Sequence, residues 1–267
     1  MRKLYVIGIG AGHPDHLTLQ AIKAMNAVDV FFFPDKGEAK QDLLRVRQDL
    51  CERHIEDQSY QVVEIPDPVR DATISSYTAR VEQWHAQRVL LYEQAILTEL
   101  REGECGAFLV WGDPTLYDSI LRIIDRILAR GHVSFEYEVI PGITSVQALA
   151  AAHKIPLNGI GESIQITTGR HLNESQFESA ETVAVTLDGD CAFKSFPEKA
   201  SEIYWGAYLG MDRQILVSGR LAEAGSEIEA AREAARAQYG WIMDCYLLRR
   251  PPASRPSDQG TAPEGRR

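Results

Sequence analysis

The sequence predicts an α/β protein of two domains, with a parallel sheet in the N-terminal domain and a mixed sheet in the C-terminal domain. Three observations support this fold class. The chain opens with a strand, a helix and a strand; a later buried strand, at 107–111, turns directly into a helix; and after Pro156 strands follow one another with few helices between them. Two strands joined by a helix require a parallel, right-handed crossover, whereas closely spaced strands favour mixed or antiparallel pairing.

The opening unit consists of an apolar strand at Lys3–Ile9, a helix from about His16 and a second strand at Val28–Phe33, which we expect Pro34 to end. The inward residues expected on this helix are Leu17, Ile22 and Met25. The rest of the domain is predicted as a helix at Ala39–His54, a strand at Gln61–Ile65, a long helical region at Ala72–Glu102 and a strand at Phe135–Ile140. The long helical region contains the apolar residues Val81, Trp84, Val89, Leu90, Tyr92, Ile96 and Leu97.

The central stretch is Ala107–Ser119, which reads A-F-L-V-W-G-D-P-T-L-Y-D-S. Its five apolar residues indicate a strand buried on both faces, which Gly112-Asp113-Pro114 stops. From Thr115 apolar residues recur at steps of three and four, which predicts a helix ending at Gly131. Such a turn lies at the carboxyl edge of a parallel sheet, where open α/β sheets bind ligands. We therefore expect Asp113 to lie over a crevice, the alternative being a capping residue in an ordinary turn.

We place the first domain at residues 1–141 and the second at 142–250, and expect 251–267 to be a disordered tail because it is rich in Pro, Gly and Ser. A helix of small residues at Thr144–His153 begins the second domain. The strands expected after it are Ser163–Thr168, Thr182–Leu187, Ile203–Leu209, Gln214–Val217 and Trp241–Leu248, with one clear helix at Leu221–Tyr239.

Composition narrows the class of protein. No apolar run approaches the roughly 18 residues of a membrane helix, and the net charge of −10 disfavours a broad nucleic-acid surface. The four cysteines are widely separated, without a C-x-x-C pair, and so predict neither a zinc site nor a disulfide framework. We expect a cytoplasmic protein that binds no metal, nucleic acid or membrane.

Glycine-rich turns follow three of the predicted strands: G-I-G-A-G-H-P-D-H-L-T at Gly8–Thr18, W-G-D-P-T-L-Y at Trp111–Tyr117, and P-G-I-T-S at Pro141–Ser145. The first turn alone suggests a dinucleotide site and therefore a nicotinamide oxidoreductase, but His13 stands where that fingerprint needs its third glycine. Together, the order and spacing of the three turns resemble those of the tetrapyrrole methyltransferases. Ala11 replaces the proline usual in that family.

The resemblance extends through Leu248 and implies a two-domain fold, a homodimer and S-adenosylmethionine bound between the domains. Further motifs are similar to one branch of the family: N-G-I-G-E-S-I-Q-I-T-T-G-R at Asn158–Arg170, T-L-D-G-D-C-A-F at Thr186–Phe193 and Y-W-G-A-Y-L-G at Tyr204–Gly210. The branch acts in aerobic cobalamin (corrin) biosynthesis; the implied reaction methylates C-1 of precorrin-5 and releases the extruded acetyl group as acetate. The alternatives are a sibling acting at another ring carbon and a non-catalytic binding module.

Residue by residue, the resemblance implies cofactor contacts from all three turns and from the second domain. These are Gly10, Gly12, Trp111, Gly112, Asp113, Leu116, Thr144, Ser145, Leu187, Asp188 and Ala207. Leu116 could instead be a core residue and Thr144 a helix cap. Deacetylation also requires an activated water and donors for an oxyanion. The catalytic candidates are Asp113, His13, Tyr117 and Arg170, of which His13 could be a solvated loop residue and Arg170 suits a substrate carboxylate.

Overall fold

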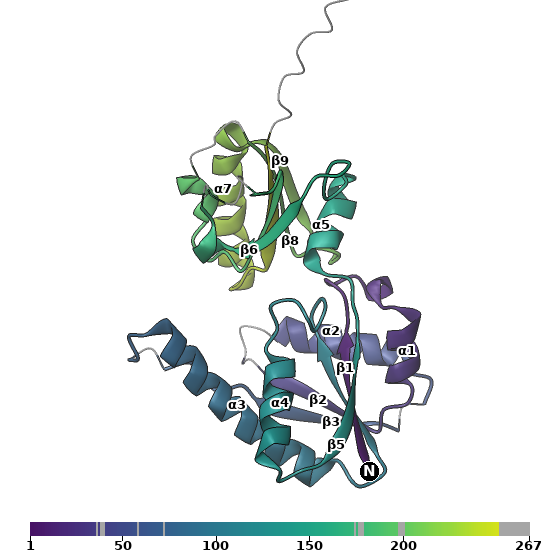
Figure 1. Cartoon of the computed structure of the whole chain (residues 1–267). Helices are drawn as coiled ribbons and strands as arrows, with labels where there is room; N and C mark the ends of the chain where they lie inside the picture. Colours follow the sequence, from purple (N-terminus) through teal and green to yellow (C-terminus); the bar gives the residue numbers. More distant parts are fainter. Residues whose placement is uncertain are drawn as a thin grey trace, which may run out of the picture.

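The computed structural model describes residues 1–35, 37, 41–57, 59–71, 73–173, 175, 179–196 and 201–250. It consists of two lobes, each with its own five-stranded sheet (Figure 1). The first sheet uses residues up to Ile140 and the second begins at Ile164, so the domain boundary that we propose after Pro141 falls between them. The tail predicted at 251–267 lies outside the described residues.

The first sheet is entirely parallel, as predicted, with the order β3-β2-β4-β1-β5. Its strands are β1 Arg2–Gly8, β2 Val30–Asp35, β3 Gln61–Pro66, β4 Cys105–Val110 and β5 Phe135–Ile140. Its helices are α1 Leu19–Met25, α2 Gln41–His54, α3 Tyr77–Glu99 and α4 Ile120–Arg130, with a short 3-10 helix, η1, at Pro14–His16. Helices α1 and α2 cover one face of the sheet and α3 and α4 the other (Figure 1). Both faces are therefore buried.

The alternation of side chains along β1 shows how this burial follows from sequence. Leu4 and Val6 pack under α3 and α4, whereas Ile7 packs with α1 and α2 on the opposite face. Successive side chains of a strand point to opposite faces, so a continuous apolar run fills two cores at once. Strand β1 lies between β4, the central strand, and β5, the edge strand.

The second sheet is mixed, again as predicted, with the order β6-β7-β10-β8-β9. Only β6 and β7 are parallel to each other; the remaining pairs are antiparallel. The strands are β6 Ile164–Thr168, β7 Thr182–Thr186, β8 Glu202–Ala207, β9 Ile215–Arg220 and β10 Asp244–Arg249. The helices are α5 Ser145–His153 and α7 Leu221–Tyr239, which cover opposite faces, and the 3-10 helices η3 Gly169–His171 and η4 Ala192–Ser195 (Figure 1).

Several predicted element ends were wrong. Strand β2 continues through Pro34 to Asp35, because its pairing with β4 stops at Phe32 and Pro34 lies where β2 has a single neighbour. The first helix begins at Leu19, after its cap Thr18, so Leu17 precedes it. The long helix begins at Tyr77, after its cap Ser76, and ends at Glu99. On this helix Leu90 and Leu97 face solvent, with exposed fractions of 51% and 37%.

The helix predicted from Thr115 begins instead at Ile120. Tyr117 has a left-handed φ of 54°, which a continuous α-helix does not allow, and the Asp118 side chain accepts a hydrogen bond from the Ile120 amide at 2.7 Å. The helix ends at Gly131, as predicted, with a φ of 71°. The turn after β4 is therefore longer than the sequence indicates, and Leu116 and Tyr117 belong to it.

Candidate active site

The three glycine turns meet at one edge of the first sheet. They follow β1, β4 and β5, which are neighbouring parallel strands whose carboxyl ends lie together. A Cβ atom on Gly142 would lie 2.1 Å from the carbonyl oxygen of Gly112, and one on Gly8 would lie 2.6 Å from the Gly142 nitrogen. Gly10 and Gly112 also exchange backbone hydrogen bonds of 3.2 and 2.8 Å. The turns pack so closely that a side chain at Gly8 or Gly142 would force them apart.

Asp113 ties two of these turns together. Its Oδ2 accepts a hydrogen bond of 2.8 Å from the Gly142 amide, and its Oδ1 accepts one of 2.8 Å from the Thr115 amide. Burial alone would raise the pKa of this carboxyl, but the bonds from Thr115 and Gly142 outweigh it and lower the pKa below the ordinary 3.8. Both oxygens are thus used within the protein, which gives the carboxylate a positioning role.

We expect Asp113→Asn to destabilise the protein by about 1–3 kcal/mol at neutral pH. The side-chain NH2 group of the asparagine would face the backbone N–H of Gly142 or of Thr115, and two donors cannot form a hydrogen bond with each other. A carboxyl with a lowered pKa stabilises the fold above its unfolded pKa, and that stabilisation is lost as the pH falls through the folded pKa. The difference between wild type and variant in the free energy of unfolding, measured in urea, should therefore be constant from about pH 7 to pH 5 and become smaller below pH 5. A difference that grows on acidification would contradict this role. Asp190→Asn, on an exposed turn, is the control.

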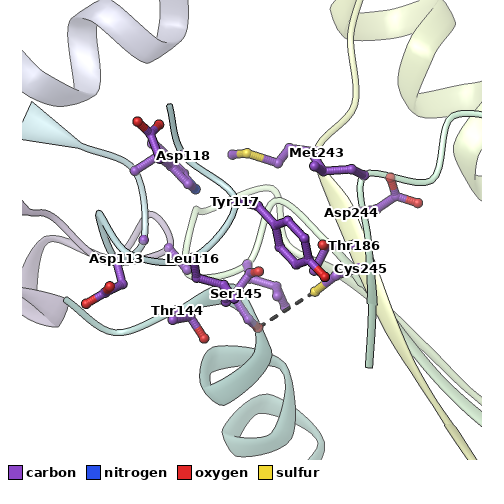
Figure 2. A pocket seen from close by; sticks show the side chains of 15 residues that line it. Asp113, Leu116, Tyr117, Asp118, Thr144, Ser145, Thr186, Met243, Asp244 and Cys245 are labelled. Atoms are coloured by element: carbon purple, nitrogen blue, oxygen red, sulfur yellow. Dashed lines mark hydrogen bonds between the residues drawn. The ribbon is translucent and has the colours of Figure 1, made fainter. Parts of the chain in front are cut away.

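A cavity of about 250 Å³ lies between these turns and the second domain. The turn after β4 forms one wall, the start of α5 forms the floor, and the ends of β7 and β10 form the opposite wall (Figure 2). The apolar side chains on the walls include Trp111, Leu116, Leu209 and Met243. Thr144 and Ser145 begin α5, where Thr144 takes part in a capping box with Gln147. Among the described residues that line the cavity there is no lysine or arginine.

Tyr117 crosses this cavity from the first domain to the second. Its hydroxyl donates a 3.2 Å hydrogen bond to the carbonyl of Ile166 in β6, and its ring lies in the middle of the view in Figure 2. Leu187, on the opposite wall, is 65% exposed and also has a left-handed φ, of 51°. Non-glycine residues in this conformation are strained, and such strain gathers at ligand sites. Both strained side chains border the cavity.

The structure brings together most of the predicted site residues and places others elsewhere. The cavity wall contains Trp111, Gly112, Asp113, Leu116, Tyr117, Thr144, Ser145 and Leu187. Six predicted residues are not on this wall: Gly10, Gly12, His13, Arg170, Asp188 and Ala207.

Each of these six has another position. Gly10 pairs with Gly112, and a Cβ on Gly12 would lie 2.7 Å from the Leu209 carbonyl, so both shape the first turn. The His13 Nδ1 accepts a 3.1 Å hydrogen bond from the Asp15 amide. Ala207 is fully buried in β8. Arg170 and Asp188 line a neighbouring cavity of about 440 Å³, which also has Leu187 on its wall.

Sequence reasoning missed seven residues of the first cavity's wall: Ala11, Asp118, Thr186, Leu209, Met243, Asp244 and Cys245. Three of these are consecutive, at the start of β10, which pairs between β7 and β8. Asp244 lies opposite Ala207 in this pairing, so the predicted contact Ala207 is the register neighbour of a residue on the cavity wall. A local pattern does not reveal that β10 inserts between two earlier strands.

Below this wall lies a buried polar network. The Asp244 carboxylate, which is 7% exposed, accepts a 2.8 Å hydrogen bond from the Trp205 indole and lies 3.2 Å from the Arg232 Nε. Burial raises the pKa of Asp244 above its ordinary value, although the charge of Arg232 opposes the shift. The Asp188 carboxylate accepts bonds from the Tyr246 hydroxyl and the Ala192 amide, both at 2.7 Å. These interactions fix the loop after β7 against β10.

The described residues also bear on metal ions, membranes and disulfides. Within the described ranges no three His, Cys, Asp or Glu side chains gather in a way that could hold a metal ion. No described helix combines the length and apolarity needed to cross a membrane. All four cysteines are free thiols.

A two-domain α/β protein with three glycine turns around an interdomain cavity defines the tetrapyrrole methylase class. The family model of the tetrapyrrole (corrin/porphyrin) methylases matches residues 3–225, and the chain belongs to this family. Over 250 residues it is 52% identical to precorrin-6A synthase (deacetylating) of Sinorhizobium sp., covering 94% of this chain and 96% of that protein. The resemblance seen in the sequence is thereby confirmed.

Solved structures agree with this assignment. A cobalamin-synthesis-related protein (CobF) from Corynebacterium diphtheriae aligns with a TM-score of 0.80 and 38% identity over 93% of this chain and 98% of that one. Uroporphyrin-III C-methyltransferase from Thermus thermophilus, solved in complex with S-adenosyl homocysteine, aligns over 92% of this chain and 91% of that one. Its TM-score is 0.54 at 16% identity, which shows a shared fold.

Proposed function

We propose that the chain is an S-adenosylmethionine-dependent methyltransferase that methylates precorrin-5 at C-1 and releases acetate, forming precorrin-6A. The observation that carries this proposal is the cavity between the three glycine turns and the second domain, in a chain 52% identical to a precorrin-6A synthase over nearly its full length. A nicotinamide oxidoreductase would use the first turn and leave the other two without a role. A sibling acting at another ring carbon remains the main alternative.

The cavity fits the proposed cofactor. A sulfonium cation is stabilised by carbonyl oxygens and aromatic faces and is repelled by cationic side chains. The described cavity wall supplies Trp111 and Tyr117 and no arginine or lysine. When bound, S-adenosylmethionine supplies an electrophilic methyl group. We propose that Trp111, Leu116, Thr144, Ser145 and Leu187 hold it, while Gly10, Gly12, Asp113, Asp188 and Ala207 shape the turns and strands around it.

The neighbouring cavity fits a substrate that carries carboxylates. Arg70, from the first domain, lies 4.3 Å from the Trp84 ring, and Arg170, from the second, lies 3.7 Å from the Tyr77 ring. Both arginines line this cavity, and within the described residues neither forms an ion pair. Because stacking on an aromatic face leaves the edge of a guanidinium open, each can bind a carboxylate bidentately. Leu187 joins this cavity to the first one.

Of the four proposed catalytic residues, Tyr117 is the one whose hydroxyl lies between the domains, at the carbonyl of Ile166. Burial raises its pKa, so the phenol stays protonated at neutral pH. Its one proton would have to turn from the Ile166 carbonyl to the substrate to donate a hydrogen bond to an oxyanion. Arg170 would orient a substrate carboxylate, and Asp113 would act through the turns that it joins. His13 would act at the edge of the site.

The direct test is incubation with precorrin-5 and methyl-labelled S-adenosylmethionine, following both the mass gain of the tetrapyrrole and the release of acetate. We expect one labelled methyl group and one acetate per turnover. Methylation without acetate would favour the sibling reaction at another carbon. Calorimetry with S-adenosylhomocysteine and with NAD provides a second criterion, and tight binding of NAD alone would overturn the proposal.

We expect Arg170→Met to raise the KM for the tetrapyrrole about tenfold with kcat changed little, because a remote carboxylate contact is equally strong in the ground and transition states. Binding of S-adenosylhomocysteine should be unaffected. The control is Arg101→Met, which removes an exposed arginine just before β4, at the opposite end of the sheet. Equal effects of the two variants, measured by initial rates, would exclude a specific contact from Arg170.

We also propose that the protein is a cytoplasmic homodimer. The four free thiols are consistent with a reducing compartment. The dimer is what the resemblance to the tetrapyrrole methyltransferases implies. Light scattering coupled to size-exclusion chromatography should give twice the chain mass of 29.8 kDa, and a monomer at micromolar concentration would exclude the dimer.

A further inference from the structure

A small third cavity lies at the carboxyl edge of the first sheet, beside the proposed cofactor site. Its volume is about 60 Å³, and Trp111 and Asp118 are common to its wall and to that of the first cavity. The rest of its lining comes from β2, α2, α3, β4 and the start of α4 and includes two buried arginines, Arg47 and Arg88. One water needs roughly 10–15 Å³, so the cavity has room for a molecule of a few heavy atoms.

Arg47 is a buried cation that forms no ion pair with a described carboxylate. Burial lowers the pKa of Arg47, and the charge of Asp118, on the same cavity wall, offsets this only in part. It is 6% exposed; its Nε donates to the Leu109 carbonyl at 3.0 Å and its Nη1 donates to the Leu43 carbonyl at 2.8 Å. Within the described residues it forms no ion pair, and its Nη2 has no hydrogen-bond partner. Burial of a charge is costly unless the charge is paired. Two neutral carbonyls therefore hold the guanidinium in place and leave its charge available.

Arg88, by contrast, has partners on every nitrogen. Its Nε lies 3.0 Å from Asp67 Oδ1, its Nη1 donates to the Ser119 hydroxyl at 2.9 Å, and its Nη2 donates to the Tyr92 hydroxyl. Asp118, the one carboxylate on the cavity wall, is exposed and accepts the Ile120 amide at 2.7 Å. The positive charge that remains unpaired at this cavity is therefore that of Arg47.

We propose that this cavity is a subsite for a small monocarboxylate of the size of acetate, bound by the Arg47 guanidinium. The subsite takes up the acetate that leaves the substrate and separates it from the reacting ring carbon; this part of the inference rests on the proposed function. A carboxylate pairs with a guanidinium through charge-assisted hydrogen bonds, which supplies the anion that the buried Arg47 lacks. The cavity volume excludes a ring or a long acyl chain.

The test is titration of the full-length protein with acetate. Binding is measured by calorimetry and by saturation transfer from the protein to the acetate methyl protons. We expect saturable binding to the wild type and at least a tenfold weaker affinity in Arg47→Met. The matched control is Arg45→Met, which removes an exposed arginine from the same helix and should keep acetate affinity within about twofold. Benzoate, which is too large for the cavity, should not compete.

A second variant keeps both buried arginines and blocks the space. Val110→Leu adds a methylene to the cavity wall and should also weaken acetate binding at least tenfold. Both variants should bind S-adenosylhomocysteine within about twofold of wild type, which shows that the fold is intact. Absent saturation in the wild type, or an equal loss in Arg45→Met and Arg47→Met, would overturn the proposal.

The same titrations separate this inference from the proposed function. If acetate binds through Arg47 and precorrin-5 is not converted, the subsite is supported as a small-carboxylate site and the proposed reaction fails. If precorrin-5 is converted to product and acetate while no acetate binds through Arg47, the subsite is excluded and the reaction stands. If acetate binds through Arg47 and precorrin-5 is also converted, added acetate should inhibit turnover in the wild type and at least tenfold less strongly in Arg47→Met.

Discussion

Gly142→Ala should abolish measurable binding of S-adenosylhomocysteine and lower the stability of the first domain. The added Cβ would lie 2.1 Å from the Gly112 carbonyl oxygen and 2.8 Å from the Gly8 carbonyl carbon, both of which are backbone atoms. Backbone atoms on neighbouring strands cannot move aside as a flexible side chain can, so the turns must separate. Because the same turns form the cavity wall, calorimetry with S-adenosylhomocysteine measures the effect directly.

Gly189→Ala is the matched control for this prediction. It makes the same chemical change on the loop after β7, where an added Cβ meets no atom within 4 Å. This variant should retain cofactor affinity within about twofold and unfold at nearly the wild-type temperature. If Gly142→Ala bound S-adenosylhomocysteine as well as the control does, the close packing of the three turns would not be what shapes the cavity.

Arg232→Met should reduce the free energy of unfolding by about 3–5 kcal/mol, the cost of leaving one member of a buried ion pair unpaired. Arg232 is 3% exposed and contacts Asp244, which lines the first cavity, and its Nη2 donates to the Asp188 carbonyl at 2.7 Å. Denaturant unfolding measures the loss. The control is Glu229→Gln, which breaks the exposed pair with Lys194 and should cost about 1 kcal/mol or less.

This variant also has a predicted pH dependence. Burial already raises the pKa of Asp244, and removing the charge of Arg232 should raise it further. A carboxyl with a raised pKa contributes stability at low pH that is lost as the pH rises through the folded value. The gap in the free energy of unfolding between wild type and Arg232→Met should therefore narrow as the pH falls from neutral through the raised pKa of Asp244. A gap that widens on acidification would show that the carboxylate of Asp244 does not dominate the loss.

Much of the fold follows from local sequence. The apolar run of β1 predicts a strand buried on both faces, and the turn residues after β1, β4 and β5 predict where ligands approach. Asp113 and Tyr117 could be found in this way because they lie within one such turn. The directions in which their side chains point could not be predicted from the sequence. Asp113 points its oxygens at Gly142 and Thr115, and Tyr117 reaches Ile166 across the cavity, because contacts distant in sequence orient both side chains.

The sequence by itself determined the two-domain α/β class, the three glycine turns and the family, because periodicity and turn chemistry act over a few residues. Only the tertiary structure decided that β10 inserts between β7 and β8, bringing Met243, Asp244 and Cys245 to the cavity. It also decided that Arg47, on a polar helix, is buried without an ion pair among the described residues. Strand insertion and charge burial depend on pairing and packing between distant segments, which no local pattern specifies.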